Sequence, residues 1–348
     1  MIPIKYKKRL FEANKDLWRD LLDEAAPSTD IGRAQSTSSM IPNLGHHKLE
    51  EKLKSKYKRK HIVFTDCASD ALDLVVHALP FKTWYAPAYT WYSPLNALAK
   101  ANCKIEFLDV EYESRTVDYS GYDPTYPILV PHIDGRAAPR PPQSARFILE
   151  DAAQSPFASG NNFGDVIILS LGSSKKLGLL GQGGCLLTDD EQLALRVKSL
   201  ACFGLSPLNE LIEPGFKSYL DPYNALCSYH IMERYEDQTH QNRIDQITAA
   251  YNDALGIQNP SGLERYTFKV TDRDHVRSTL HEAGIETRVW IKKHGGQLPA
   301  YGKTPGPLPI SDKLVEECLD IPLYELLTDH EVEHIEKCLR TLSEYVTN

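Results

Sequence analysis

Long apolar runs, an excess of basic residues and closely paired cysteines are all missing from this chain of 348 residues. Its longest apolar stretches, 72–79 and 166–171, are much shorter than the ~20 apolar residues that span a bilayer. The 39 Lys and Arg are outnumbered by 47 Asp and Glu, which gives a formal charge of −8. A protein that grips a phosphate backbone normally carries a basic face. We therefore expect neither a membrane protein nor a nucleic-acid-binding protein.

The seven cysteines are odd in number, widely spaced and without a C-x-x-C pair, which argues against a structural zinc site. No metal site is predicted, and the pattern favours reduced thiols that pack as small apolar residues. The first eight residues are basic but lack the apolar core and the cleavage site of a secretory signal. These features predict a cytoplasmic protein.

Apolar segments alternate with helical stripes through the first half of the chain. We predict strands at 61–65, 83–86, 104–109, 126–130, 147–149, 166–171 and 184–188, and helices at 46–57, 69–79 and 91–101. Such alternation indicates a mostly parallel sheet covered by helices on both faces. Ligand sites in these folds gather at the carboxyl ends of the strands.

The two ends of the chain have a different character. Near the N-terminus, a helical stripe over 6–25 ends at Pro27. The second part of the chain predicts helices at 237–255, 272–283 and 329–345 and strands at 265–270 and 287–291. A Pro/Gly-rich loop is expected at 298–309. We predict an N-terminal helix over 1–25, a large α/β domain over 26–236 and a small C-terminal α+β domain over 237–348.

Two segments concentrate polar residues that could do chemistry. Glu150-Asp151-Ala152-Ala153-Gln154 follows an apolar strand, where Asp151 could face a ligand or cap a helix. Lys175 and Lys176 precede a glycine-rich turn at 181–184, the reverse of the P-loop order, which disfavours a P-loop. A lysine held at a strand end could be a desolvated amine fit for Schiff-base chemistry, whereas a loop lysine is more often solvated.

In order along the chain, these motifs resemble those of the DegT/DnrJ/EryC1/StrS family, the pyridoxal-phosphate-dependent sugar aminotransferases of fold type I. The resemblance rests on the segments 67–72, 87–91, 105–110, 150–154, 164–165, 170–171, 181–184, 215–217, 283–294 and 321–328, together with Lys175. It spans roughly residues 30–345. It implies the fold type I architecture, in which a large domain with a mostly parallel sheet is joined to a small α+β domain.

The resemblance implies pyridoxal 5'-phosphate and pyridoxamine 5'-phosphate as the cofactor forms. Lys175 would form the Schiff base and later move a proton, and Asp151 would keep the ring nitrogen protonated. Gln154 would hydrogen-bond the 3-hydroxyl of the ring. Trp91 would stack on the ring face, the alternative being a buried core tryptophan.

The phosphate and the substrate have their own implied contacts. Ala68, Ser69 and Ser170 would bind the phosphate near a helix start. Lys217 would reach it from the partner subunit, because the family's sites lie at a homodimer interface, although a solvated loop lysine is the alternative. Trp290 and His294 fall near the family's W-x-P-x-H pattern, without its proline, and would lie near the sugar nucleotide.

Two further features depart from the family pattern. Tyr219 occupies a position where the family usually carries arginine. The helix that normally precedes the E-D strand is not expected, since prolines crowd 138–142 and remove backbone donors. The chain looks like a shortened member that keeps the cofactor-binding set.

The implied function is transfer of an amino group, with glutamate as donor, to a keto-deoxy nucleotide sugar through a Lys175 Schiff base and a pyridoxamine phosphate intermediate. One alternative is a pyridoxal-phosphate-dependent sugar dehydratase, which Lys175 opposes because the family's dehydratases carry histidine there. The other is a non-catalytic shortened homologue kept as a regulator, which the retained cofactor set opposes.

Overall fold

The computed structural model describes residues 1–3, 44–157, 162–178, 181–236, 238–302 and 306–347. The helix predicted at 6–25 lies outside this part of the chain. Within the described ranges, no helix combines the length and the apolar composition needed to cross a membrane. All seven cysteines are free thiols.

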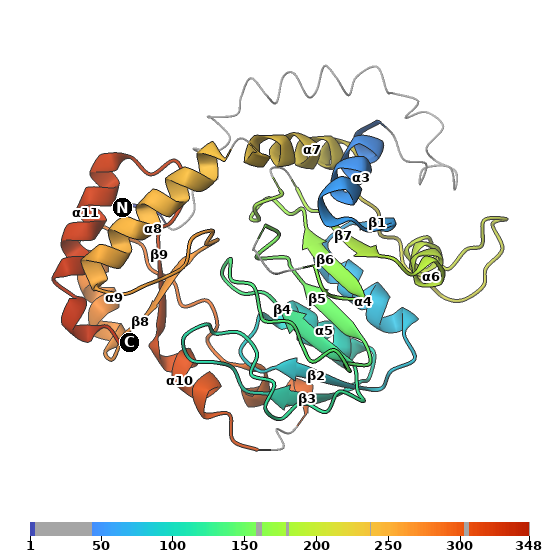
Figure 1. The fold of residues 1–348 in the computed structure, drawn as a ribbon, viewed down its shortest axis with the longest axis horizontal. Helices are drawn as coiled ribbons and strands as arrows, with labels where there is room; N and C mark the ends of the chain where they lie inside the picture. Colours follow the sequence, from blue (N-terminus) through green and yellow to red (C-terminus); the bar gives the residue numbers. More distant parts are fainter. Residues whose placement is uncertain (4–43, 158–161, 179–180, 237, 303–305, 348) are drawn as a thin grey trace.

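A seven-stranded sheet forms the centre of the molecule (Figure 1). Its order is β1-β7-β6-β5-β4-β2-β3. The strands are β1 (His61–Thr65), β2 (Thr83–Pro87), β3 (Lys104–Leu108), β4 (Ile128–Pro131), β5 (Ile148–Asp151), β6 (Val166–Ser170) and β7 (Gly184–Thr188). All neighbours are parallel except β7, which runs antiparallel to both β1 and β6. The mostly parallel sheet predicted from the sequence is confirmed.

Helices cover both faces of this sheet. They are α3 (Leu44–Tyr57), α4 (Ala68–Ala78), α5 (Tyr92–Lys100), α6 (Glu191–Ala201) and α7 (Pro222–Glu236). Along β6, Ile168 joins the core under α4, α5 and α6, whereas Ile167 and Leu169 join the core under α3 and α7. Burial on both faces explains why β6 is apolar throughout rather than alternating.

The C-terminal part has its own two-stranded sheet and its own core. It contains α8 (Thr239–Leu255), β8 (Tyr266–Lys269), α9 (Arg273–Glu282), α10 (Pro309–Glu317), β9 (Cys318–Ile321) and α11 (Asp329–Arg340). The strand β8 pairs antiparallel with β9, and α8 packs against α11. Most apolar side chains of these elements form a cluster separate from those of the large sheet. Leu314 and Val315 of α10 instead pack in a cluster with Tyr89, Val110 and Ile133 of the large domain. The domain boundary at residues 236–237 stays a prediction.

The strand predicted at 287–291 is wrong. Only an isolated bridge forms there, in which Arg288 exchanges both backbone hydrogen bonds with Asp320 at 3.0 and 2.8 Å. The chain then leaves the sheet, and Trp290 packs against Trp91 instead. A tertiary contact therefore overrides the β-branched pattern of this segment, and β9, which the sequence did not indicate, takes its place beside β8.

The proline-rich link between β4 and β5 contains no helix, as predicted. It is held instead by side chains of the large domain. The Nδ1 atom of His132 accepts the Ala138 backbone N–H at 2.9 Å, and the Tyr119 hydroxyl donates to the Pro139 carbonyl at 2.6 Å. The link therefore stays ordered without helical hydrogen bonds.

Candidate active site

Four structural elements end or begin at one edge of the large sheet. Asp151 is the last residue of β5, and Ser170 is the last residue of β6, where it pairs with Gly184 at the start of β7. Gly184 abuts the start of α4, since a Cβ built there would lie 2.3 Å from the Ala68 nitrogen. The sheet thus brings Asp151, Ser170 and the α4 N-terminus to the edge where such folds bind ligands.

Asp151 is buried, and Lys175 and His132 are the charges that act on it. Its Oδ1 atom accepts the Ala153 N–H at 3.0 Å. Burial raises the pKa of Asp151, and this hydrogen bond and the Lys175 charge offset only part of the rise. Residues 152–157 form turns rather than a helix, so Asp151 is not a helix cap. A buried carboxyl of this kind can hold or share a proton with a ligand.

The two adjacent lysines have separate partners. Lys175 Nζ lies 3.4 Å from Glu264 Oε1, and the lysine side chain is 17% exposed. Lys176 Nζ donates to the Gly262 carbonyl at 2.6 Å. Of the two lysines, Lys175 is the one whose charge lowers the pKa of Asp151, which makes Lys175 the candidate amine at the sheet edge. No motif in the sequence pointed to Glu264, because it lies in a loop far along the chain.

The start of α4 offers donors for an anion. The N–H groups of Ala68 and Ser69 belong to the first turn, where an α-helix provides no carbonyl to accept them. The Ser69 hydroxyl lies 2.6 Å from that of Ser93 at the start of α5. Ser170 ends β6 and pairs there with Gly184, which abuts Ala68. Helix N-termini with neighbouring hydroxyls suit phosphate groups. Ser93 is a member of this set that the sequence did not single out.

Lys217 is exposed and lies next to a residue that contacts α4. Its Nζ sits 5.5 Å from the centroid of the Tyr219 ring. The neighbouring Ser218 donates to Asp70 Oδ2 at 2.6 Å and accepts the Asp66 N–H at 2.9 Å. The segment is therefore anchored at the start of α4, and the partner-subunit role of Lys217 stays a prediction.

Trp91 and Trp290, distant in sequence, contact each other. Their ring centroids are 4.5 Å apart with planes inclined by 31°. Trp91 precedes α5 and is 36% exposed, so it is not a buried core residue. The guanidinium carbons of Arg265 and Arg288 lie 3.9 and 4.9 Å from the Trp290 ring centroid. The two tryptophans therefore form one aromatic surface between the large sheet and the C-terminal part.

His294 is buried and engaged by its own chain. Its Nε2 atom lies 3.0 Å from Asp312 Oδ1, and its Nδ1 atom accepts the Gly296 N–H at 3.1 Å. It thereby caps the short 3-10 helix Gly295–Gln297. These contacts occupy both ring nitrogens, and the substrate role assigned to His294 stays a prediction.

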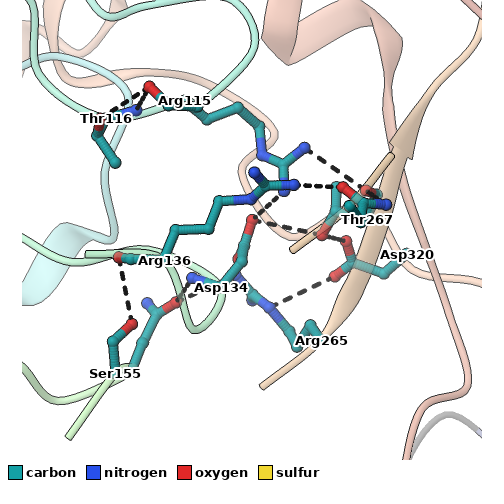
Figure 2. Close-up of polar contacts among 11 residues, drawn as sticks. Arg115, Thr116, Asp134, Arg136, Ser155, Arg265, Thr267 and Asp320 are labelled. Atoms are coloured by element: carbon teal, nitrogen blue, oxygen red, sulfur yellow. Dashed lines mark hydrogen bonds and ion pairs between the residues drawn. The ribbon is translucent and has the colours of Figure 1, made fainter. Parts of the chain in front are cut away.

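Gln154 contacts a buried ionic cluster of Asp134, Arg115 and Arg265, which Figure 2 shows. Its Oε1 atom accepts from the Asp134 N–H and from Arg265 Nη2, both at 3.2 Å. Asp134 forms ion pairs with Arg265 and, at 3.1 Å, with Arg115. Burial alone would raise the pKa of Asp134, but the two arginines lower it to about 2. Sequence analysis missed this cluster, because its members come from four separate segments.

Glu150, the first residue of the E-D-A-A-Q motif, has a structural partner in His132. Glu150 Oε1 lies 2.9 Å from His132 Nε2. The carboxylate also accepts three backbone N–H groups, those of Asn162, Phe163 and Gly164. Burial would raise the pKa of Glu150, but His132 and these N–H groups lower it. Glu150 thus fixes the end of β5 that presents Asp151.

Known proteins resemble this chain in sequence. A family model described as the DegT/DnrJ/EryC1/StrS aminotransferase family matches residues 143–340. A "Pleiotropic regulatory protein" of Geobacillus stearothermophilus is 24% identical over 322 residues, 83% of this chain and 86% of that protein. A UDP-2-acetamido-2-deoxy-3-oxo-D-glucuronate aminotransferase of Pseudomonas aeruginosa is 25% identical over 308 residues, 80% and 85% of the two chains.

A solved structure shares the fold. The crystal structure of a DegT DnrJ EryC1 StrS aminotransferase from Brucella abortus matches with a TM-score of 0.84 and 22% identity, over 98% of this chain and 99% of that one. The predicted fold type I architecture is therefore confirmed. Because the family model covers more than half of the sequence, the chain belongs to the DegT/DnrJ/EryC1/StrS aminotransferase family and is an enzyme that transfers amino groups.

Proposed function

We propose that this enzyme uses pyridoxal phosphate to transfer an amino group from glutamate to a keto-deoxy nucleotide sugar. The observation that carries the proposal is that β5 ends at the buried Asp151 and that the turn after the adjacent β6 carries Lys175, whose charge acts on the Asp151 carboxyl. The name of the Pseudomonas aeruginosa relative, an aminotransferase of a UDP-linked 3-oxo sugar, supports the substrate class.

The residues at the sheet edge fit this cofactor. The first-turn N–H groups of Ala68 and Ser69, with the hydroxyls of Ser69 and Ser170, suit its phosphate. Asp151 is a buried carboxyl suited to the ring nitrogen, and Lys175 is an amine suited to the aldehyde. The set supplies a partner for each polar end of pyridoxal phosphate.

When bound, the cofactor supplies an electron sink for the bonds at the amino-bearing carbon. Lys175 Nζ accepts and returns the proton, and Glu264 Oε1, at 3.4 Å, orients that amine. Burial raises the pKa of Asp151, which makes its carboxylate a stronger base and favours a proton on the ring nitrogen that it would face. Trp91 offers its ring to the face of the cofactor, and Trp290, which packs against Trp91, orients the sugar side and excludes water.

We also propose a homodimer in which Lys217 contributes to the partner's phosphate site. The segment after α6 projects at the edge of the molecule (Figure 1) and exposes large apolar side chains. These are Phe203, Leu208, Leu211, Ile212 and Phe216, with Leu208 81% exposed. Exposed apolar patches of this kind mark interaction surfaces, and Lys217 directly follows the patch.

The test is product formation with a panel of nucleotide-linked keto sugars and glutamate. Mass spectrometry is expected to show a nucleotide amino sugar and an equal amount of 2-oxoglutarate for at least one panel member. Lys175→Ala is expected to form neither product. Turnover of the panel without a new amino group would instead indicate a dehydratase.

A further inference from the structure

One guanidinium group contacts residues on both sides of the site. Arg265 precedes β8, and its Nη2 atom lies 3.2 Å from Gln154 Oε1 in the large domain. The same side chain forms an ion pair with Asp134 and lies 3.9 Å from the Trp290 ring centroid. Arg265 therefore touches the proposed cofactor side through Gln154 and the proposed sugar side through Trp290.

The contact determines which end of the Gln154 amide faces a ligand. Arg265 Nη2 and the Asp134 N–H are both donors, and both reach Oε1. If the amide were flipped, its NH2 group would face Arg265 Nη2 and the Asp134 N–H, which are also donors. None of these donors would then have an acceptor in this contact. Gln154 therefore keeps Nε2 as the atom that can donate to a ligand oxygen.

Burying the Arg265 guanidinium costs free energy, because several of its donors have no hydrogen-bond partner among the described residues. It is only 8% exposed, and its Nη1 atom has no hydrogen-bond partner in the described part of the chain. Its Nε atom lies 3.8 Å from Asp320 Oδ2, beyond hydrogen-bond distance. Buried charges with unsatisfied donors are expensive, and apolar residues often replace such pairs without loss of stability. A role in the site accounts for this arrangement better than a role in folding.

The second contact of Arg265 supports the aromatic surface. The guanidinium lies over the Trp290 ring, and Trp290 in turn lies against Trp91. The Trp290 Nε1 atom is buried and has no hydrogen-bond partner among the described residues. The ring is thus held by its faces, through the cation and its aromatic neighbour.

We propose that Arg265 is a positioning residue that fixes the Gln154 amide for the cofactor's phenolic oxygen and the Trp290 ring for the nucleotide sugar. The inference rests on the proposed function. It assigns no step of the chemistry to Arg265, which acts through these two side chains. Loss of Arg265 should therefore weaken cofactor binding and raise the KM for the sugar, with a smaller effect on kcat.

The test compares Arg265→Lys with Arg115→Lys in the full chain. Lysine keeps the positive charge beside Asp134 but loses the planar group that spans Gln154 and Trp290. Arg115 pairs with the same Asp134 at 3.1 Å and no contact joins it to Gln154 or Trp290, so Arg115→Lys is the matched control for a weakened cluster. Pyridoxal phosphate affinity is measured by titration, and tryptophan emission is recorded without cofactor.

We expect Arg265→Lys to weaken pyridoxal phosphate binding about tenfold, the size of one hydrogen bond from a charged group. It should also shift the tryptophan emission of the cofactor-free protein. Arg115→Lys should change neither quantity. A double variant with Gln154→Ala should bind the cofactor no more weakly than Gln154→Ala alone, because both changes remove one interaction. If the two substitutions instead weakened cofactor binding independently, so that their factors multiplied in the double variant, the proposal would be overturned.

Gln154→Glu provides a second variant should Arg265→Lys not fold. Glutamate keeps an acceptor for Arg265 and for the Asp134 N–H but has no Nε2 donor. Its melting temperature should equal or exceed that of the wild type, while cofactor affinity falls about tenfold. Unchanged affinity in Gln154→Glu or in folded Arg265→Lys overturns this inference alone. A wild-type protein that binds no pyridoxal phosphate overturns the proposed function with it.

Discussion

Lys175 Nζ lies 3.4 Å from Glu264 Oε1, a contact that joins the turn after β6 to the loop before β8. Only 17% of the lysine side chain and 7% of the glutamate side chain are exposed, so water screens the pair weakly. The amine that we propose for the Schiff base is therefore oriented by a residue 89 positions further along the chain.

Glu264→Gln should reduce kcat about tenfold. The glutamine amide is neutral, so it would orient the Lys175 amine more weakly than the Glu264 carboxylate does. The KM for the nucleotide sugar should change little, since Glu264 contacts the lysine and not the aromatic surface. Steady-state kinetics would measure both. Lys176→Ala is the control, because Lys176 contacts the Gly262 carbonyl instead, and its kcat should stay near the wild-type value. Equal losses in the two variants would contradict the assignment.

Asp151→Asn should raise the melting temperature of the cofactor-free protein and lower kcat. Burial raises the pKa of Asp151 in the folded protein, so its charge costs stability as pH rises through that pKa. A neutral amide escapes this cost, and the cofactor-free variant should melt at a higher temperature than the wild type at pH 7. Its kcat should fall about 10²-fold or more because the ring nitrogen loses its acidic partner. A lower melting temperature at pH 7, measured by calorimetry, would refute this account of Asp151.

Asp134 should stabilise the fold above about pH 4. Its folded pKa of about 2 lies below its ordinary value of 3.8, so its contribution is complete above the ordinary value and is lost as pH falls toward 2. The shift corresponds to about 2 kcal/mol. Asp134→Asn should therefore unfold more readily than wild type at pH 7, and the difference should shrink between pH 4 and 2. Urea titrations across this range would measure it, and a difference independent of pH would rule out the ionic explanation.

Gly184→Ala should weaken cofactor binding by displacing the α4 N-terminus. The added Cβ would lie 2.3 Å from the Ala68 nitrogen, so backbone must move. We expect a loss of stability of about 1–3 kcal/mol and a higher dissociation constant for pyridoxal phosphate. Gly121→Ala is the control, because its Cβ would meet only Leu108 Cδ2 at an ordinary 3.6 Å. Titration and thermal unfolding of the two variants test this, and equal behaviour would contradict it.

Local patterns predicted the large sheet well. The strands β1 and β7 begin and end where their apolar residues predict, at His61–Thr65 and Gly184–Thr188. The segment 287–291 has a similar pattern but forms no strand, since Trp290 is drawn to Trp91. The helices α6, α7 and α10 were also not predicted. Their packing depends on distant elements, which local periodicity does not reveal.

The motifs pointed to the site, and the structure supplied its supporting residues. Asp151 and Lys175 stand in recognisable segments, and the fold brings them together at one sheet edge. Glu264 and Arg265 reach Lys175 and Gln154 across 89 and 111 residues of sequence. No periodicity or spacing links positions that far apart, so these contacts follow only from the tertiary arrangement.

The visible absorption spectrum of the purified protein with pyridoxal phosphate tests whether Lys175 binds the cofactor for transfer of an amino group. We expect a visible band that glutamate bleaches, that Lys175→Ala abolishes or shifts, and that Lys176→Ala leaves unchanged. A protein that takes up no pyridoxal phosphate, or a Lys175→Ala variant with the wild-type band and the wild-type response to glutamate, would contradict it.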